Sequence, residues 1–258
     1  GIEVIDATGA TGTSRILGDW SADTLDMRGV QLKGNIVIDA AYGNDTVIGS
    51  ASADTIVGGG GDDSLDGGGA GDTYRVTGNQ AAGWSSFQGF DTHADTGTSG
   101  TDTVVALGTG DVDIGVKAWG SSTGIEVINA MGATGTVRLL GDSSANTLNL
   151  SSTTLTGSNI VIDGGHGNDT ITGNAAANTI VGAGGNDKLD GGNGGDTYRV
   201  TGNQAGGWNS FHGFDTYADS GASGIDTLRA IGTGNVDIGL AGWVNTGIEA
   251  INATGATG

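Results

Sequence analysis

The sequence contains no cysteine and no proline among its 258 residues. Disulfide bonds therefore cannot cross-link the fold, and its stability must come from another source. Only 9 basic residues oppose 29 acidic ones, and the formal charge of −20 excludes binding to nucleic acid or to an anionic membrane by charge attraction. No apolar run approaches the ~18 residues of a membrane-spanning helix, so we expect no membrane insertion.

Motifs of common hydrolases are also missing. The sequence has no G-x-S-x-G, no H-E-x-x-H and no cysteine nucleophile. Its three glutamates, Glu3, Glu126 and Glu249, share one repeated position, and we expect them to end a strand and to pair with Arg15 or Arg138. The three histidines exchange with tyrosine or glutamine between the two halves, which is not typical of a general base. The sequence therefore predicts no enzymatic activity.

Glycine, by contrast, is abundant, with 54 residues, and the chain repeats itself. GIEVIDATGATG begins at Gly1, GIEVINAMGATG at Gly124 and GIEAINATGATG at Gly247. We expect two tandem units of 123 residues and the start of a third, within a longer array. The predicted division is 1–123 (β-roll core about 40–76, insert about 81–123), 124–246 (core about 164–200, insert about 205–246) and 247–258.

Each predicted core has an acid or amide every nine residues, followed two positions later by an apolar side chain. In the two units these positions are Asp45, Asp54, Asp63, Asp72, Asp169, Asn178, Asp187 and Asp196. Glycine-rich turns, which tolerate positive φ, separate short strands whose apolar residues point inward. Stacked strands, ~4.8 Å apart, would align the acids along the turns. In a two-sided roll, acids eighteen residues apart share an edge, as Asp45 and Asp63 would.

A row of carboxylates repels itself unless a cation lies between its members. Calcium takes carboxylate and carbonyl oxygens as ligands, so we expect these eight residues to bind it, with Asn178 the weaker ligand. In the alternative interpretation, the Asp and Asn side chains only close their own turns through hydrogen bonds. We favour metal because turn closure does not require such regular carboxylates.

The nonapeptides, such as GSASADTIV and GGGGDDSLD, resemble the G-G-x-G-x-D-x-U-x repeat of the RTX (hemolysin-type calcium-binding) family, where U is a large apolar residue. The resemblance implies an all-β fold, a parallel β-roll or β-solenoid with loop-rich inserts, and several calcium ions per unit. It also implies type I secretion from a Gram-negative bacterium and folding outside the cell. We expect a structural repeat of a large surface protein, as an adhesin stalk, surface layer or filament, with units contacting their neighbours and self-associating laterally.

The inserts leave more alternatives open. Their aromatic residues would form a satellite core or a platform for a carbohydrate ligand, and these are Trp84, Phe87, Phe90, Trp119, Trp208, Phe211, Phe214 and Trp243. Their acids would wrap an additional calcium ion or lie in a surface loop closed by Asx turns, and these are Asp91, Asp95, Asp102, Asp215, Asp219 and Asp226. Tyr74 and Tyr198 are expected to plug the end of each roll. Two rival classes are the secretion and folding tail of a secreted enzyme and a carbohydrate- or ice-binding module.

Overall fold

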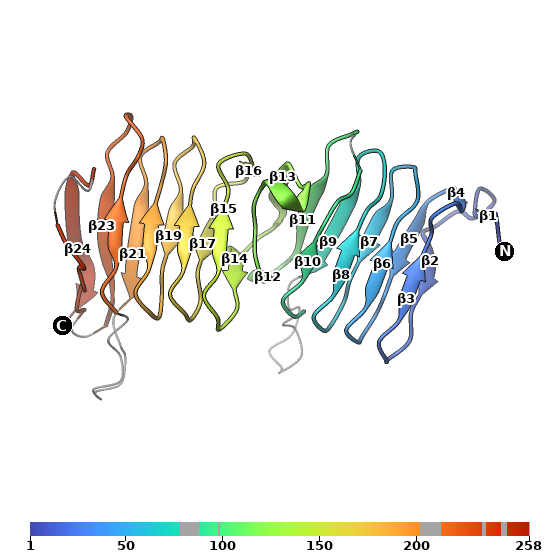
Figure 1. The fold of residues 1–258 in the computed structure, drawn as a ribbon, viewed down its shortest axis with the longest axis horizontal. Coiled ribbons are helices and arrows are strands. Elements are labelled where there is room, and N and C mark those ends of the chain that lie inside the picture. The colour runs from blue at the N-terminus through green and yellow to red at the C-terminus, as the bar shows by residue number, and fades with distance from the viewer. Residues whose placement is uncertain (78–87, 98, 202–212, 234–235, 244–246, 258) are drawn as a thin grey trace. The chain divides into compact units, whose positions relative to one another are not determined.

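The computed structural model describes residues 1–77, 88–97, 99–201, 213–233, 236–243 and 247–257 (Figure 1). Strands and one 3₁₀ turn make up its regular structure in these ranges. The chain divides into two compact units, whose bounds differ from those of the predicted 123-residue repeats, and the first and second unit below are these two. The first comprises Gly1–Val116, Ser121–Val137 and Thr153–Asn159, and the second comprises Lys117–Gly120, Arg138–Ser152 and Ile160–Gly258.

The first unit is a stack of short parallel strands in two main sheets. One sheet has the order β16-β13-β11-β9-β7-β5-β2, with bounds Thr154–Thr156, Val127–Ala133, Thr103–Gly108, Thr73–Thr77, Thr55–Val57, Ile36–Asp39 and Ser14–Leu17. The other has the order β10-β8-β6-β3, with bounds Thr92–His93, Ser64–Asp66, Thr46–Ile48 and Thr24–Asp26. Strands β1 (Val4–Asp6) and β4 (Gln31–Lys33) form a separate two-stranded sheet. After β11 the chain forms β12 (Val112–Val116) and then the 3₁₀ turn Ser121–Thr123.

The second unit repeats this arrangement. One of its sheets runs β14-β17-β19-β21-β23-β24, with bounds Val137–Gly141, Ile160–Asp163, Thr179–Val181, Thr197–Thr201, Thr227–Thr233 and Ala250–Thr257. The other runs β15-β18-β20-β22, with bounds Thr147–Asn149, Thr170–Thr172, Lys188–Asp190 and Thr216–Ala218. Both units therefore have the all-β, parallel β-roll architecture that the nonapeptide pattern predicts.

Successive strands alternate between the two sheets, so each strand pairs with the next but one. Thr46 lies opposite Ser64, and Thr55 lies opposite Thr73, which is the predicted eighteen-residue step. The middle residue of each short strand points inward, and the resulting ladders form the core. Val47, Ile56 and Ile171 are 0% exposed, because each lies between like residues of the neighbouring coils.

The described parts of the inserts are more regular than expected. β10 pairs with β8 and β11 pairs with β9, so the stack continues beyond the nonapeptides. The prediction that Tyr74 plugs the end of the roll is wrong for the same reason, since its ring lies inside the ladder between Ile56 and Val104. Tyr198 lies in the same way between Ile180 and Leu228.

Candidate metal sites

The acids of the nonapeptides form continuous rows along the turns. In each row, one oxygen of an acid accepts the backbone N–H of the corresponding residue one coil earlier. Asp63 Oδ1 accepts from Asp45 at 2.8 Å, and Asp72 Oδ1 accepts from Asp54 at 2.7 Å. The second unit repeats both contacts, from Asp169 to Asp187 at 2.8 Å and from Asn178 to Asp196 at 2.6 Å. The structure thus brings the predicted pairs together through one oxygen of each carboxylate.

The rows extend beyond the nonapeptides in both directions. Before the first block, the Asp23 N–H donates to Asp45 Oδ1 at 2.7 Å. After it, Asp63 donates to Asp91 Oδ1 at 3.0 Å and Asp72 donates to Asp102 Oδ1 at 2.6 Å. Asn146, Asp215 and Asp226 are the equivalents in the second unit.

Sequence reasoning missed Asp23 and Asn146 because their coils are longer than nine residues. A usable signal was present, since both are followed by threonine and leucine, as in the nonapeptide positions, and both follow a glycine five residues earlier.

The glutamates also belong to these rows. Glu126 Oε2 accepts the Asp102 N–H at 2.8 Å, and Glu249 Oε2 accepts the Asp226 N–H at 2.7 Å. The predicted pairing of Glu126 and Glu249 with arginine is therefore wrong. The two arginines instead lie beside aspartates on the sheet surface, Arg15 at 3.0 Å from Asp39 and Arg138 at 4.0 Å from Asp163.

The second oxygen of six of these aspartates is buried and accepts no hydrogen bond. These atoms are Oδ2 of Asp45, Asp63, Asp72, Asp169, Asp187 and Asp196. Their side chains are almost fully enclosed, with Asp63 2% and Asp187 1% exposed. A buried carboxylate oxygen without a donor is costly, so each of these positions requires a proton or a cation.

The backbone of these turns explains why the oxygens remain without donors. In all six turns, the residues four and two positions before the aspartate have positive φ, for example Gly59 at 97° and Gly61 at 129° before Asp63. We call such turns open turns. Alanine adopts the strained conformation at Ala41, Ala70 and Ala183, which are the positive-φ residues other than glycine in the described chain. The turn geometry is therefore imposed by the stack rather than by glycine alone.

Two predicted ligands lie in turns of a different kind, which we call closed turns. Asp54 Oδ2 accepts the N–H of Ser50 at 2.5 Å, and Asn178 Oδ1 accepts the N–H of Asn174 at 2.8 Å. Asp23 Oδ2 accepts the Asp19 N–H at 2.7 Å in the same way. These turns have no positive φ at the positions four and two residues before the acid, so the amide four residues before it can reach the side chain.

Burial shifts the pKa of the open-turn acids upward. It raises the pKa of Asp63 to about 6 and those of Asp72 and Asp187 to about 7, with neighbouring aspartates adding to the shift. The charged form is thus disfavoured unless a positive charge is nearby. A divalent cation with oxygen ligands would supply that charge.

Five of the six open-turn acids have a glycine five residues earlier, whereas Ala40 holds that position before Asp45. A Cβ at Gly58 would lie 2.5 Å from Asp63 Oδ2, and one at Gly182 would lie 2.4 Å from Asp187 Oδ2. A side chain at either glycine would push the carboxylate away. The donor set of carboxylates beside glycine-rich backbone, with buried oxygens that lack donors, therefore fits calcium.

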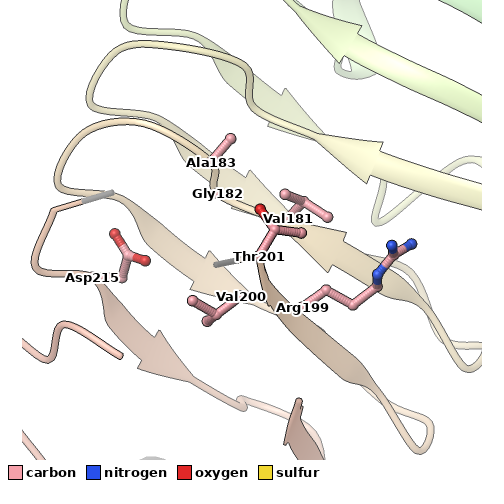
Figure 2. Close-up of a pocket in the computed structure, with 7 residues that line it drawn as sticks. All are labelled: Val181, Gly182, Ala183, Arg199, Val200, Thr201 and Asp215. Carbon is pink, nitrogen blue, oxygen red and sulfur yellow. The ribbon is translucent and has the colours of Figure 1, made fainter. Parts of the chain in front are cut away.

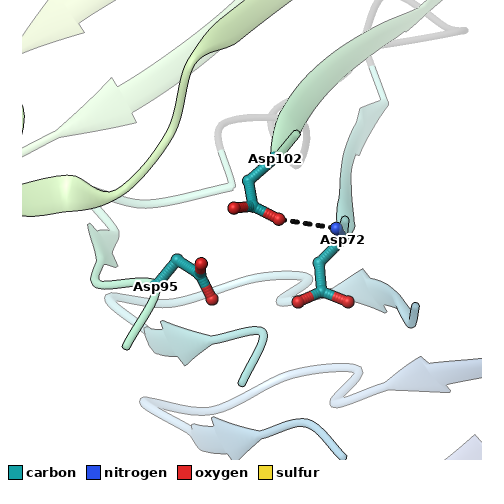
Figure 3. A group of neighbouring side chains, drawn as sticks. All are labelled: Asp72, Asp95 and Asp102. Atoms are coloured by element: carbon teal, nitrogen blue, oxygen red, sulfur yellow. Dashed lines mark hydrogen bonds between the residues drawn. The ribbon is translucent and has the colours of Figure 1, made fainter. Parts of the chain in front are cut away.

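The insert acids separate into two locations. Asp91 lies in the row of Asp63, whereas Asp95 joins Asp72 and Asp102 (Figure 3), with one oxygen of each carboxylate within 4.8 Å of the others. The second unit holds the matching group of Asp196, Asp219 and Asp226. The expected single loop around one ion does not form from Asp91, Asp95 and Asp102, because the first belongs to the opposite edge.

The aromatic residues of the inserts are only partly described. Trp84, Phe87, Trp208 and Phe211 lie outside the described residues. Trp119 is 2% exposed and bridges Leu148 in the second unit, Phe90 is half-buried, and Phe214 and Trp243 are 54% and 42% exposed. A different aromatic pair is exposed in the first unit, where Trp20 stacks on Tyr42 with ring centroids 5.0 Å apart.

Two cavities lie among the described residues. One of about 10 Å³ lies beside Gly182 and Asp215 (Figure 2), with the Arg199 side chain directed away from Asp215, and its volume suits about one water molecule. Another, of about 450 Å³, is lined by glycine-rich turns with Arg28 and Asp66. Arg28 pairs with Asp26 at 2.5 Å, and Asp66 accepts hydrogen bonds from Thr96. Within the described part of the chain, no helix has the length and hydrophobicity needed to cross a membrane.

A family model matches two segments of the chain. Residues 39–74 and 163–198 match the family model of the RTX calcium-binding nonapeptide repeat (4 copies). The matched segments contain all six open turns and the closed turns of Asp54 and Asn178. No curated protein matches the chain.

Proposed function

We propose that calcium held in the open turns folds and stiffens this chain outside the cell. Both nonapeptide blocks belong to the RTX calcium-binding nonapeptide repeat family, so the chain is a calcium-binding repeat protein. RTX repeats are typical of secreted proteins of Gram-negative bacteria. The role that follows is a structural repeat of a large surface protein, as an adhesin stalk, surface layer or filament.

The observation that best supports calcium binding is that six buried Oδ2 atoms accept no hydrogen bond. The ligands we assign are the open-turn aspartates Asp45, Asp63, Asp72, Asp169, Asp187 and Asp196. Asp91 and Asp215 continue one row of each unit but are not assigned as ligands, since both oxygens of Asp215 already accept hydrogen bonds, from Asp187 and Tyr217. Asp54 and Asn178 are left as turn-closing residues, because an amide already occupies the oxygen that would face an ion. Bound calcium would neutralise charge that the folded chain otherwise has to bury.

This assignment couples binding to folding, because an unfolded chain offers no preformed site. Weak sites suffice for such a role, since extracellular modules bind calcium with Kd of about 10⁻⁴–10⁻³ M. The chain would then remain unfolded during export from a low-calcium cytoplasm and fold on the outside.

Limited proteolysis tests the proposal. The chain is treated with a nonspecific protease in chelator and in about 10⁻³ M calcium, with magnesium at the same concentration as control. We expect rapid digestion in chelator and in magnesium, and protection of both units in calcium. Equal protection under all three conditions would refute calcium-dependent folding.

A secreted enzyme could also use this chain as its calcium-dependent tail. The sequence of the whole protein separates the two roles, since an attached catalytic domain supports the tail and further 123-residue units support the structural array.

The exposed stack of Trp20 on Tyr42 favours carbohydrate binding as a second candidate function. Serine occupies the position of Trp20 in the second unit, at Ser143, so Trp20→Ser is a natural matched variant. Loss of glycan-array binding in this variant, with calcium-dependent folding intact, would support the candidate. The double variant Trp84→Ala and Trp208→Ala tests the insert aromatics in the same assay.

A further inference from the structure

Each unit contains a cluster of three aspartates of which only one belongs to the matched family segments. Asp72 lies in the first block, but Asp95 and Asp102 lie beyond residue 74. Asp196 lies in the second block, but Asp219 and Asp226 lie beyond residue 198. Figure 3 shows the first cluster, with the Asp95 side chain reaching toward those of Asp72 and Asp102.

The nonapeptide acid of each cluster has an oxygen without a donor. Asp72 is 1% exposed, its Oδ1 accepts the Asp54 N–H at 2.7 Å, and its Oδ2 accepts no hydrogen bond. Asp196 is 0% exposed and repeats this arrangement, with its Oδ1 accepting the Asn178 N–H at 2.6 Å. Each side chain therefore carries a buried oxygen that needs a proton or a cation.

The preceding coil cannot complete a site for Asp72. That coil is the closed turn of Asp54, whose Oδ2 already accepts the Ser50 N–H. In the second unit the same place holds Asn178, an uncharged amide that accepts from Asn174. The additional carboxylates for Asp72 and Asp196 must come from the following coil, where Asp95 and Asp102, or Asp219 and Asp226, lie.

The carboxylates from the following coil lie unusually close together. Asp102 Oδ1 accepts the Asp72 N–H at 2.6 Å, while one oxygen of Asp95 lies within 4.8 Å of both partners. Asp95 Oδ1 is itself buried without a hydrogen bond. Three carboxylates at this separation repel one another strongly unless a cation lies among them.

We propose, resting on the calcium-binding role above, that each cluster binds one calcium ion, which is the ion of the Asp72 or Asp196 turn and is separate from the ions of the other open turns. The ligands are Asp72, Asp95 and Asp102 in one unit and Asp196, Asp219 and Asp226 in the other. Asp95 follows β10 and Asp102 precedes β11, so the ion fastens the chain that returns from the insert onto the start of β9. The site thus closes the nonapeptide block against the next coil.

Calcium stoichiometry of the 258-residue chain tests the proposal. The double variant Asp95→Asn and Asp219→Asn changes one cluster residue in each unit, and the matched control is Asp113→Asn with Asp237→Asn, two equivalent acids outside the clusters. We expect the cluster variant to bind two fewer ions per chain in isothermal titration calorimetry, one for each cluster, while the control retains all ions. Unchanged stoichiometry in the cluster variant would overturn the proposal.

A measurement on the unmodified chain covers the case in which the variant fails to fold. Crystals grown in calcium should give an anomalous difference peak within ~2.6 Å of carboxylate oxygens from all three residues of each cluster. A folded chain with peaks in the nonapeptide rows but none at the clusters refutes the cluster sites alone. A folded chain that takes up no calcium anywhere refutes the function proposed above as well.

Discussion

Replacing Gly58 with alanine is predicted to weaken calcium binding at Asp63 without straining the backbone. The φ of Gly58 is not positive, so alanine fits its conformation. The new Cβ would lie 2.5 Å from Asp63 Oδ2, whereas ordinary contacts begin at 3.4 Å. The oxygen must therefore retreat by roughly 0.9 Å, the difference between these two distances, which exceeds the ~0.2 Å tolerance of a metal–ligand distance.

The expected size of the effect follows from steric overpacking, which costs about 1–3 kcal/mol in closely packed sites. Applied to the bound state, this corresponds to a roughly 5- to 150-fold loss of affinity. The assay is a calcium titration followed by far-UV circular dichroism, with the midpoint compared between variants.

Gly69→Ala is the matched control for this prediction. Its Cβ would meet Ala51 at 3.4 Å, an ordinary contact, and its φ is also not positive. We expect Gly69→Ala to keep the wild-type midpoint or to gain about 0.4–1 kcal/mol from reduced freedom of the unfolded chain. Equal midpoints for Gly58→Ala and Gly69→Ala would refute the reasoning, because the two variants differ mainly in their distance from a carboxylate oxygen.

Three further predictions concern pH, the two turn classes and strain. In chelator, the folded chain holds protons on Asp63, Asp72 and Asp187 up to pH of about 6–7, whereas the unfolded chain releases them near the ordinary aspartate pKa of about 3.9. The folded state binds more protons in this window, so its stability falls as pH rises. The far-UV β-signal of the chain in chelator should therefore be larger at pH 5 than at pH 8, and the opposite order would contradict the shifts. Asp54→Asn should leave the midpoint of the calcium titration unchanged, because the Ser50 N–H already donates to Asp54 Oδ2. Asp63→Asn should raise that midpoint at least about tenfold, because a charged ligand is lost. Equal effects of the two variants in calorimetry would argue against the division into open and closed turns. Ala183→Val places a β-branched residue at a φ of 65° and should cost about 1–3 kcal/mol in thermal unfolding with calcium, whereas Ala176→Val, in a closed turn, should change stability by less than about 0.5 kcal/mol.

The nine-residue spacing was sufficient to predict the parallel roll and the pairing of acids eighteen residues apart. The contact of Asp45 with Asp63 follows directly from that register. The spacing could not predict that the stack continues through the insert, because the coils that lead to Asp91 and Asp102 differ in length from the nonapeptides. Strand pairing there depends on which apolar residues complete the inner ladder, such as Val104 beside Tyr74.

The division into open and closed turns was also not predicted from the regular acids. Asp54 and Asp63 occupy the same position in the nonapeptide, yet of the two only Asp63 has a buried oxygen without a donor. The difference arises from the residues four and two positions earlier, which are glycines before Asp63 and serines before Asp54. Alanine obscures this signal, because Ala183 adopts the positive φ that its residue type disfavours.

Far-UV circular dichroism during calcium titration of the chelated chain, with magnesium titrated in parallel, tests the central claim most directly. The buried oxygens of the open turns predict a cooperative transition from coil to β-structure in calcium and no such transition in magnesium. A chain that already has its full β-signal in chelator at neutral pH would contradict the dependence of the fold on calcium.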